Sequence, residues 1–256
     1  MTPSGNIPVV MVACKVLQSI LEQLLPEERM GYRAVFMDYG LHRVPANMTR
    51  ELQDTIDGIE DPSLVVMGYG LCGNGLNGIM AGNHTLLIPK VDDCIAILLG
   101  SRRIYNREFT AVPGTYYLSK GWLESGSHPL KEYEEYAQKY GEKEAAWIMD
   151  QQYKNYERLV LVAHSRSDLE KYRPQALEVA NYCEQWNMRY EEILGSDRYV
   201  RRLIEVIDDP NEGDEEFIVV PAGGQIRQEL FWDFQVVTPQ KQPTISGQEK
   251  TVRSSA

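Results

Sequence analysis

The chain has 256 residues, of which 43% are hydrophobic and 25% are charged, as in ordinary globular proteins. Its 26 basic and 37 acidic residues give a net charge of −11, which argues against binding to nucleic acid or to an anionic membrane. No apolar run approaches the roughly 18–20 residues that cross a bilayer, and residues 1–14 lack the basic start of a secretory signal. We therefore expect a cytoplasmic protein whose four cysteines are buried, metal-binding or reactive rather than disulfide-bonded.

The first part of the chain alternates short apolar runs with amphipathic stretches. Strands are predicted at residues 9–13, 32–37, 64–67 and 85–89. Helices are predicted at residues 15–24, 47–59 and 94–100. This alternation predicts a mainly parallel sheet with right-handed crossovers.

The second part of the chain repeats the alternation after a helical span. A short strand at 115–118 precedes a charged helical region at 130–156, which should break near Gly141. Further strands at 158–163, 188–193 and 217–220 enclose a helix capped by Ser167 and another at 198–207.

The predicted fold is therefore α/β, with two Rossmann-like lobes, mainly parallel sheets and a central cleft. The expected organisation is an N-terminal lobe at 1–125, a helical connector at 126–157 and a C-terminal lobe at 158–236. The polar stretch at 237–256 is predicted to be a disordered tail.

Three cysteines follow three of the predicted strands. Cys14 follows the first strand, Cys72 lies in the glycine-rich loop after 64–67, and Cys94 lies in the acidic loop after 85–89. If these strands are parallel neighbours, the thiols meet at the sheet edge where open α/β sheets bind ligands. The helix starts next to Cys14 and Cys94 would favour thiolates, which bind zinc and iron–sulfur clusters. The alternative for each is a small buried hydrophobe, which is the interpretation for Cys183.

The fourth ligand of such a metal site is less clearly indicated. His164 ends the strand at 158–163 and is the candidate, although a hydrogen-bonded loop histidine is the alternative. Asp92 and Asp93 are weaker ligand candidates, which could instead cap the helix that begins at Cys94 or orient the ligands. A fourth position left open to water or substrate would indicate a catalytic metal.

The glycine-rich loop formally matches a dinucleotide-binding pattern. The segment from Gly68 to Gly73 reads G-x-G-x-x-G and is followed by acidic residues about 20 positions later. Glycines at 75, 78 and 82 weaken the helix that this motif requires, so a glycine turn close to a bound group is favoured. The candidate cofactor contacts are Gly68, Tyr69, Gly70, Gly73, Asp92, Asp93, Gly223 and Gly224. Other polar candidates at strand ends are Tyr39, Trp122, Glu124, Arg166 and Gln225.

At GYGLCGNG, IPKVDDCIAILLGS, TYYLSKGWLE and PAGGQ, the chain resembles the domain-of-unknown-function family 1638. The resemblance runs from about Pro8 to Phe231, and it implies that Cys14, Cys72 and Cys94 belong to the family pattern. Members of this family are often encoded near corrinoid-dependent methyltransferases. The resemblance therefore implies one-carbon or thiol chemistry, with a corrinoid protein as a partner, without establishing a reaction.

The leading expectation is a metal-thiolate protein that binds zinc or an iron–sulfur cluster through its three cysteines and acts in thiol or methyl-group transfer on a small-molecule substrate. One alternative is a non-catalytic protein or chaperone that holds a corrinoid-type cofactor. Another is a nucleotide-dependent enzyme that uses the glycine loop.

Overall fold

The computed structural model describes residues 7–25, 33–210 and 215–232. The fold is mixed α/β with mostly parallel sheets, as the alternating pattern predicts. The residue at position 32 and the expected tail at 237–256 lie outside the described residues. Within the described part of the chain, no helix combines the length and the apolar character needed to cross a membrane.

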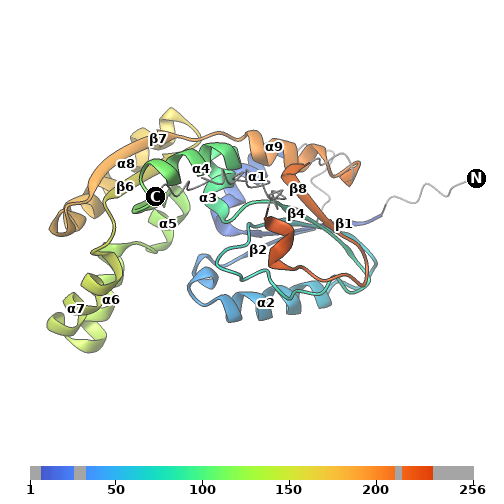
Figure 1. Ribbon diagram of the computed structural model, residues 1–256, viewed down its shortest axis with the longest axis horizontal. Helices are drawn as coiled ribbons and strands as arrows, with labels where there is room; N and C mark the ends of the chain where they lie inside the picture. The colour runs from blue at the N-terminus through green and yellow to red at the C-terminus, as the bar shows by residue number, and fades with distance from the viewer. Residues whose placement is uncertain (1–6, 26–32, 211–214, 233–256) are drawn as a thin grey trace, which may run out of the picture.

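The first sheet has the strand order β2-β1-β3-β4-β8 (Figure 1). Four of its strands run parallel: β1 (Val9–Cys14), β2 (Arg33–Met37), β3 (Leu64–Gly68) and β4 (Thr85–Pro89). The edge strand β8 (Phe217–Val220) pairs with β4 in the antiparallel direction. The strands β1, β3 and β4 are therefore parallel neighbours, as the cysteine argument required.

Helices cover both faces of this sheet. Helix α2 (Pro45–Asp57) lies on one face, and α1 (Gln18–Leu24), α3 (Cys94–Leu99) and α9 (Arg198–Glu205) lie on the other (Figure 1). Helix α2 buries a single stripe, whereas α3 buries every residue after its first. A helix that is apolar on all sides must be covered on all sides. The first sheet covers one side of α3, and the second sheet of the protein covers the other side.

The second sheet has three parallel strands: β5 (Thr115–Ser119), β6 (Arg158–Ala163) and β7 (Arg189–Leu194). Its central strand β6 is buried along its whole length, and its successive side chains pack alternately into two hydrophobic cores. Val160 and Val162 pack with the helices of the first sheet, whereas Leu159, Leu161 and Ala163 pack in the core that contains α8 (Arg166–Cys183). The two sheets therefore share one helical layer between them.

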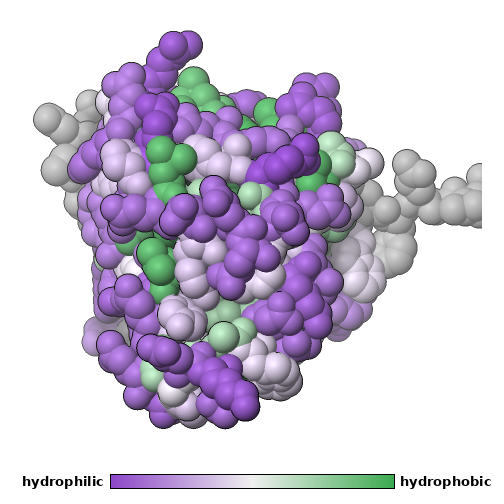
Figure 2. Space-filling view, turned by 90° about the vertical axis from the view of Figure 1, so that its left-hand side faces the viewer, coloured by the Kyte–Doolittle hydropathy of each residue, from purple (hydrophilic) through white to green (hydrophobic). Residues whose placement is uncertain are grey.

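A helical hairpin connects β5 to β6. After α5 (Lys120–Ser125), α6 (Pro129–Tyr140) and α7 (Glu142–Tyr153) meet at Gly141, where φ is +87°. The predicted break at Gly141 is thus confirmed, because only glycine adopts this conformation without strain. The hairpin is a crossover within one sheet rather than a connector between lobes. Figure 2 shows that the end of the molecule carrying it is mainly hydrophilic.

The predicted lobes do not coincide with the division of the strands between the two sheets. Strand β5, expected in the lobe at 1–125, belongs to the second sheet, and β8, expected in the lobe at 158–236, completes the first. An unpaired edge of β4 would expose backbone hydrogen-bonding groups, and β8 covers that edge. Helix α4 (Arg102–Ala111) was not predicted, and the cap of α8 is Ser165 rather than Ser167.

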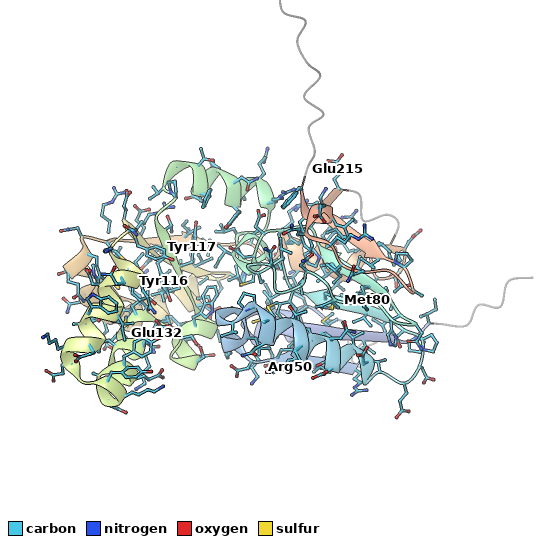
Figure 3. The ribbon with its side chains drawn as sticks, turned by 60° about the horizontal axis from the view of Figure 1, so that its bottom comes forward. Arg50, Met80, Tyr116, Tyr117, Glu132 and Glu215 are labelled. Atoms are coloured by element: carbon cyan, nitrogen blue, oxygen red, sulfur yellow. The ribbon has the colours of Figure 1, made fainter. Side chains whose placement is uncertain are left out.

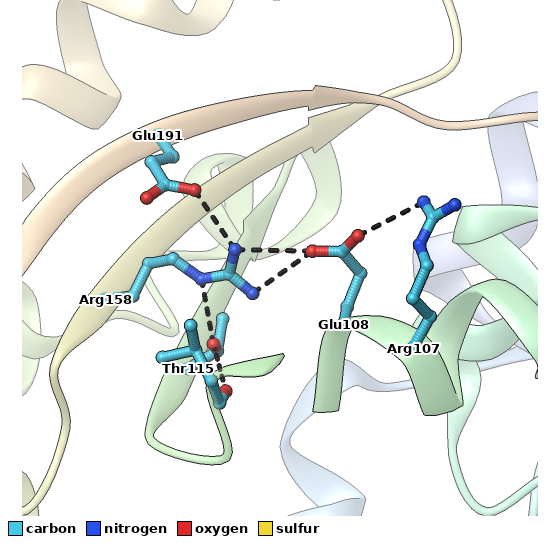
Figure 4. Close-up of polar contacts among 6 residues, drawn as sticks. Arg107, Glu108, Thr115, Arg158 and Glu191 are labelled. Atoms are coloured by element: carbon cyan, nitrogen blue, oxygen red, sulfur yellow. Dashed lines mark hydrogen bonds and ion pairs between the residues drawn. The ribbon is translucent and has the colours of Figure 1, made fainter. Parts of the chain in front are cut away.

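A buried arginine joins α4 to the second sheet (Figure 4). Arg158 is 5% exposed and donates from Nε to Thr115 Oγ1 at 3.0 Å. Its Nη1 donates to Glu191 Oε2 at 3.0 Å, and Nη1 and Nη2 donate to Glu108 Oε2 at 3.3 Å. Because a buried unpaired charge costs several kcal/mol, these acceptors allow a guanidinium to lie inside the sheet.

Candidate thiol-lined binding site

A cavity of about 320 Å³ lies at the carboxyl ends of the parallel strands of the first sheet. The thiols of Cys14, Cys72 and Cys94 all line it. Tyr39 and Trp122 lie in the same cavity wall and come from η3 (Tyr39–Arg43) and α5. The three cysteines that the sequence placed at one sheet edge are therefore gathered in one cavity.

Each thiol is positioned by a different element. Cys14 is the last residue of β1 and is buried, and Cys94 is the first residue of α3 and is half-buried. Cys72 lies in the loop after β3 with φ of +48°, a conformation that non-glycine residues rarely adopt. Such strain is concentrated at functional sites, and here it sets the direction of the Cys72 side chain.

The glycine-rich loop packs against the turn that precedes Cys94. The amide of Leu71 donates to the carbonyl of Val91 at 2.9 Å, and the amide of Cys72 donates to the carbonyl of Asp92 at 2.8 Å. A Cβ at Gly70 would lie 2.8 Å from the backbone of Asp93, so only glycine allows this close approach. The loop thereby brings Cys72 to the same place as Cys94.

The same loop lacks the context of a dinucleotide-binding motif. No helix begins within residues 69–84, all of which the structure describes. Two of the loop amides that could contact a phosphate are used on the carbonyls of Val91 and Asp92. The glycine turn predicted from the sequence is present, and the helix N-terminus that would bind a pyrophosphate is absent.

Asp93 is the cap of α3, as one of the sequence interpretations proposed. Its Oδ1 accepts from the amide of Ile95 at 2.8 Å, and its Oδ2 accepts from the Tyr105 hydroxyl at 3.0 Å. Burial raises the pKa of the Asp93 carboxyl, opposed by these two hydrogen bonds. Tyr105 was not among the sequence candidates, since nothing in its helix marks it as a partner of a residue twelve positions away.

Burial disfavours the thiolate form of all three cysteines. Burial raises the pKa of Cys14 from 9.0 to about 11, and the charge of Asp38 adds to the effect. Burial, the charge of Asp93 and the Cys14 thiol raise the pKa of Cys72. Burial raises the pKa of Cys94 as well, with the Cys72 and Cys14 thiols and the charge of Asp93 adding to the effect. Loss of water on burial therefore opposes the stabilisation of thiolates that the helix starts next to Cys14 and Cys94 would give.

Tyr69 adds an unpartnered polar group to the cavity. Its side chain is 3% exposed, and its hydroxyl has no hydrogen-bond partner among the described residues. Burial raises its pKa, and the charges of all three thiols would raise it further. A buried hydroxyl without a partner costs about 1–3 kcal/mol, so a bound ligand that accepts its hydrogen bond would relieve this cost.

The thiols do not form a preformed metal site. Among residues 7–25, 33–210 and 215–232, no group of three or more His, Cys, Asp or Glu side chains has an arrangement that could hold a metal ion. Binding of one ion by all three sulfurs would therefore require the cysteine side chains to rotate toward a common centre.

Six of the predicted site residues do not line the cavity: Gly68, Gly70, Asp92, His164, Gly223 and Gly224. His164 does not line it; its ring contacts the backbone of Leu98, near the other end of α3 from Cys94, and burial lowers its pKa. Gly223 donates its amide to the carbonyl of Gly82 at 2.7 Å, and the carbonyl of Gly224 accepts from the amide of Ala81. Because β8 runs antiparallel, its carboxyl end lies at the opposite edge of the sheet.

Three other residues of the cavity were not predicted as site residues. Asp38 and Leu41 follow β2, and Ile95 follows Cys94 in α3. The only feature of the sequence that could have identified them as site residues is their position shortly after a strand or a cysteine. Their side chains are ordinary for loops and helices, so the sequence alone did not separate them from neighbours.

Comparison with known proteins gives a family assignment. A family model described as "Protein of unknown function (DUF1638)" matches residues 36–204. The chain belongs to this family. No curated protein and no solved structure matches it. The DUF1638 match includes Cys72, Cys94 and Trp122, whereas Cys14 lies before the matched region.

Proposed function

We propose that this protein binds a thiophilic metal centre, a zinc ion or an iron–sulfur cluster, through Cys14, Cys72 and Cys94. The observation that carries the proposal is that cysteines from three separate segments line one cavity at the carboxyl ends of adjacent parallel strands. Ligand sites of open α/β sheets occur at this edge. Sulfur donors select zinc and iron–sulfur clusters over magnesium or calcium.

The electrostatics of the cavity support a cation there. The carboxylates of Asp38 and Asp93 line the cavity, and no lysine or arginine side chain is among the described residues that do so. A thiophilic cation would favour the thiolates, which are both the metal ligands and the nucleophilic form of cysteine.

The fourth coordination position is proposed to be open. His164, the ligand candidate from the sequence, lies outside the cavity, so a metal held by the cysteines alone would have a position for water or substrate. An open position is typical of catalytic rather than structural sites. We therefore propose thiol or methyl-group transfer: Cys14, Cys72 and Cys94 would hold the metal, which would lower the pKa of a substrate thiol, and Tyr69 would donate a hydrogen bond to the bound substrate. Such chemistry needs the reduced thiols of a cytoplasmic protein.

The size of the cavity bears on the substrate. At about 320 Å³ it is at the lower end of the roughly 300–1,000 Å³ of small-molecule sites, which favours a small thiol or one-carbon donor. A corrinoid is larger than such ligands. We therefore propose that a corrinoid, if involved, is brought by a partner protein, and we do not favour a corrinoid chaperone or a nucleotide-dependent enzyme.

Metal analysis of protein purified without oxygen tests this proposal. We expect zinc or iron in stoichiometric amount in the wild-type protein and a large loss in Cys72→Ala. Cys183→Ala is the matched control, because Cys183 is equally a free thiol but is the last residue of α8 and is buried in the core of the second sheet. The proposal would be contradicted if the wild-type protein held no metal after reconstitution with zinc, or with iron and sulfide, and if Cys72→Ala had the same metal content as the wild type.

A further inference from the structure

A second cavity, of about 660 Å³, adjoins the thiol-lined one. It lies between β5, α5 and the α6–α7 hairpin. Its lining is rich in aromatic rings: Tyr116, Tyr117, Trp122, Tyr136, Tyr153 and Tyr156. One carboxylate, Glu132, lines it, and no lysine or arginine is among the described lining residues. Figure 3 shows Tyr116 and Tyr117 on β5 and Glu132 on α6 in the same region of the molecule. We call this the aromatic cavity.

Three of its rings form a fixed cluster. The centroids of Tyr116 and Tyr153 are 5.5 Å apart at an interplanar angle of 70°, and those of Tyr116 and Tyr156 are 5.5 Å apart at 83°. These are edge-to-face contacts, which stabilise ring pairs by about 0.5–1.5 kcal/mol beyond the burial of their surface. Tyr116 and Tyr156 remain half-buried, so ring surface is left toward the cavity.

The carboxylate is held among these rings. The Tyr153 hydroxyl donates to Glu132 Oε2 at 2.6 Å. Burial raises the pKa of Tyr153, and the charge of Glu132 raises it further, so this tyrosine remains a proton donor. The aromatic cavity therefore combines fixed rings with a negative charge and without a basic side chain in its described lining.

This combination defines the chemistry of a ligand. The faces of aromatic rings carry partial negative charge and attract cations by about 0.5–2 kcal/mol for each contact. A carboxylate adds attraction for a cation and repulsion for an anion. Quaternary and tertiary ammonium groups fit best, because their apolar surface suits the rings and their charge suits the carboxylate.

We propose that the aromatic cavity binds an organic cation with a quaternary or tertiary ammonium group. Ile95 and Trp122 line both cavities, so a ligand in the aromatic cavity would lie on the other side of these two side chains from the thiols. This places the cation next to the proposed metal site. The inference itself rests on the lining of the aromatic cavity and does not require a metal.

The test compares a cation with its neutral isostere. Choline and 3,3-dimethyl-1-butanol have the same shape, and only choline is charged. We expect choline to bind metal-free protein saturably at millimolar concentrations or below, measured by calorimetry. The neutral alcohol should bind at least about tenfold more weakly, which corresponds to ~1.4 kcal/mol.

Variants separate the cavity from the rest of the surface. Glu132→Gln keeps an acceptor for Tyr153 but removes the charge, so choline affinity should fall by about tenfold or more. Glu134→Gln is the control on the same helix, because Glu134 is exposed and pairs with Lys131. Thermal unfolding of each variant checks that it is folded. Absence of choline binding, equal binding of the alcohol, or an equal effect of the two variants would overturn the proposal.

Discussion

The contact between the glycine-rich loop and the turn before Cys94 gives a prediction that tests how the site is built. In Gly70→Ala, the new Cβ would lie 2.8 Å from the nitrogen and Cα of Asp93, whereas ordinary contacts begin at 3.4 Å. The two backbone segments must therefore separate by about 0.6 Å. The atoms that the new Cβ would meet belong to the backbone of Asp93 and not to a flexible side chain. The separation would therefore lengthen the hydrogen bonds that the amides of Leu71 and Cys72 donate to the turn.

The cost of this change can be estimated from these contacts. Overpacking costs about 1–3 kcal/mol, and each weakened hydrogen bond adds up to about 1 kcal/mol. We expect Gly70→Ala to lower the free energy of unfolding by about 2–5 kcal/mol in a urea titration. Gly78→Ala is the control in the same loop: its Cβ meets nothing within 4 Å, and only its φ of +93° costs about 1–2 kcal/mol.

A second readout links this perturbation to the thiols. Movement of the loop should increase the rate at which Cys72 reacts with an alkylating reagent in Gly70→Ala, and it should leave that rate unchanged in Gly78→Ala. If both variants unfold at the same urea concentration and alkylate at the wild-type rate, the loop does not hold Cys72 as described.

Three further predictions address the thiols and the second sheet. Because the pKa of Cys14 is raised from 9.0 to about 11, its contribution to stability is complete below pH 9 and is lost as pH rises toward 11. Urea titrations should show that the free energy of unfolding falls by about 2–3 kcal/mol over this pH range in the wild type and by less in Cys14→Ala. An equal fall in the variant would show that Cys14 is not the titrating group. Phenylarsine oxide, which bridges neighbouring thiols, should bind wild-type protein reversibly and bind Cys72→Ala more weakly, and equal binding would show that the thiols are not neighbours. Arg158→Ala should cost about 3–5 kcal/mol in thermal or urea unfolding, whereas Arg107→Ala, which removes an exposed partner of the same glutamate, should cost no more than about 1 kcal/mol; equal costs would show that burial of Arg158 is unimportant.

The arrangement of the three cysteine-bearing segments could be predicted from the sequence. Buried β-branched runs alternating with amphipathic helices make parallel neighbours of β1, β3 and β4, and parallel strands end at the same edge. The cap formed by Asp93 was also predictable, because aspartate directly before a helix is a favoured cap.

Features that depend on tertiary packing could not be predicted. The four residues of β8 carry no signal for their direction, so the sequence did not show that Gly223 and Gly224 follow a strand whose carboxyl end lies opposite the cysteines. The pKa values of Cys14 and Cys94 depend on burial by side chains distant in sequence, which the local sequence around each cysteine does not indicate. The aromatic cavity joins residues of β5 and α6–α7, whose tyrosines form no recognisable motif in the sequence.

Titration with cobalt(II) under anaerobic conditions tests most directly whether the thiols of Cys14, Cys72 and Cys94 share one metal. Cobalt(II) takes the place of zinc and gives a sulfur-to-metal charge-transfer absorption only when thiolates bind it. We predict that this absorption saturates at one equivalent in wild-type protein and in Cys183→Ala, and that it falls strongly in alanine variants of Cys14, Cys72 and Cys94. No such absorption in the wild-type protein, or an absorption that survives each of the three substitutions, would contradict the account.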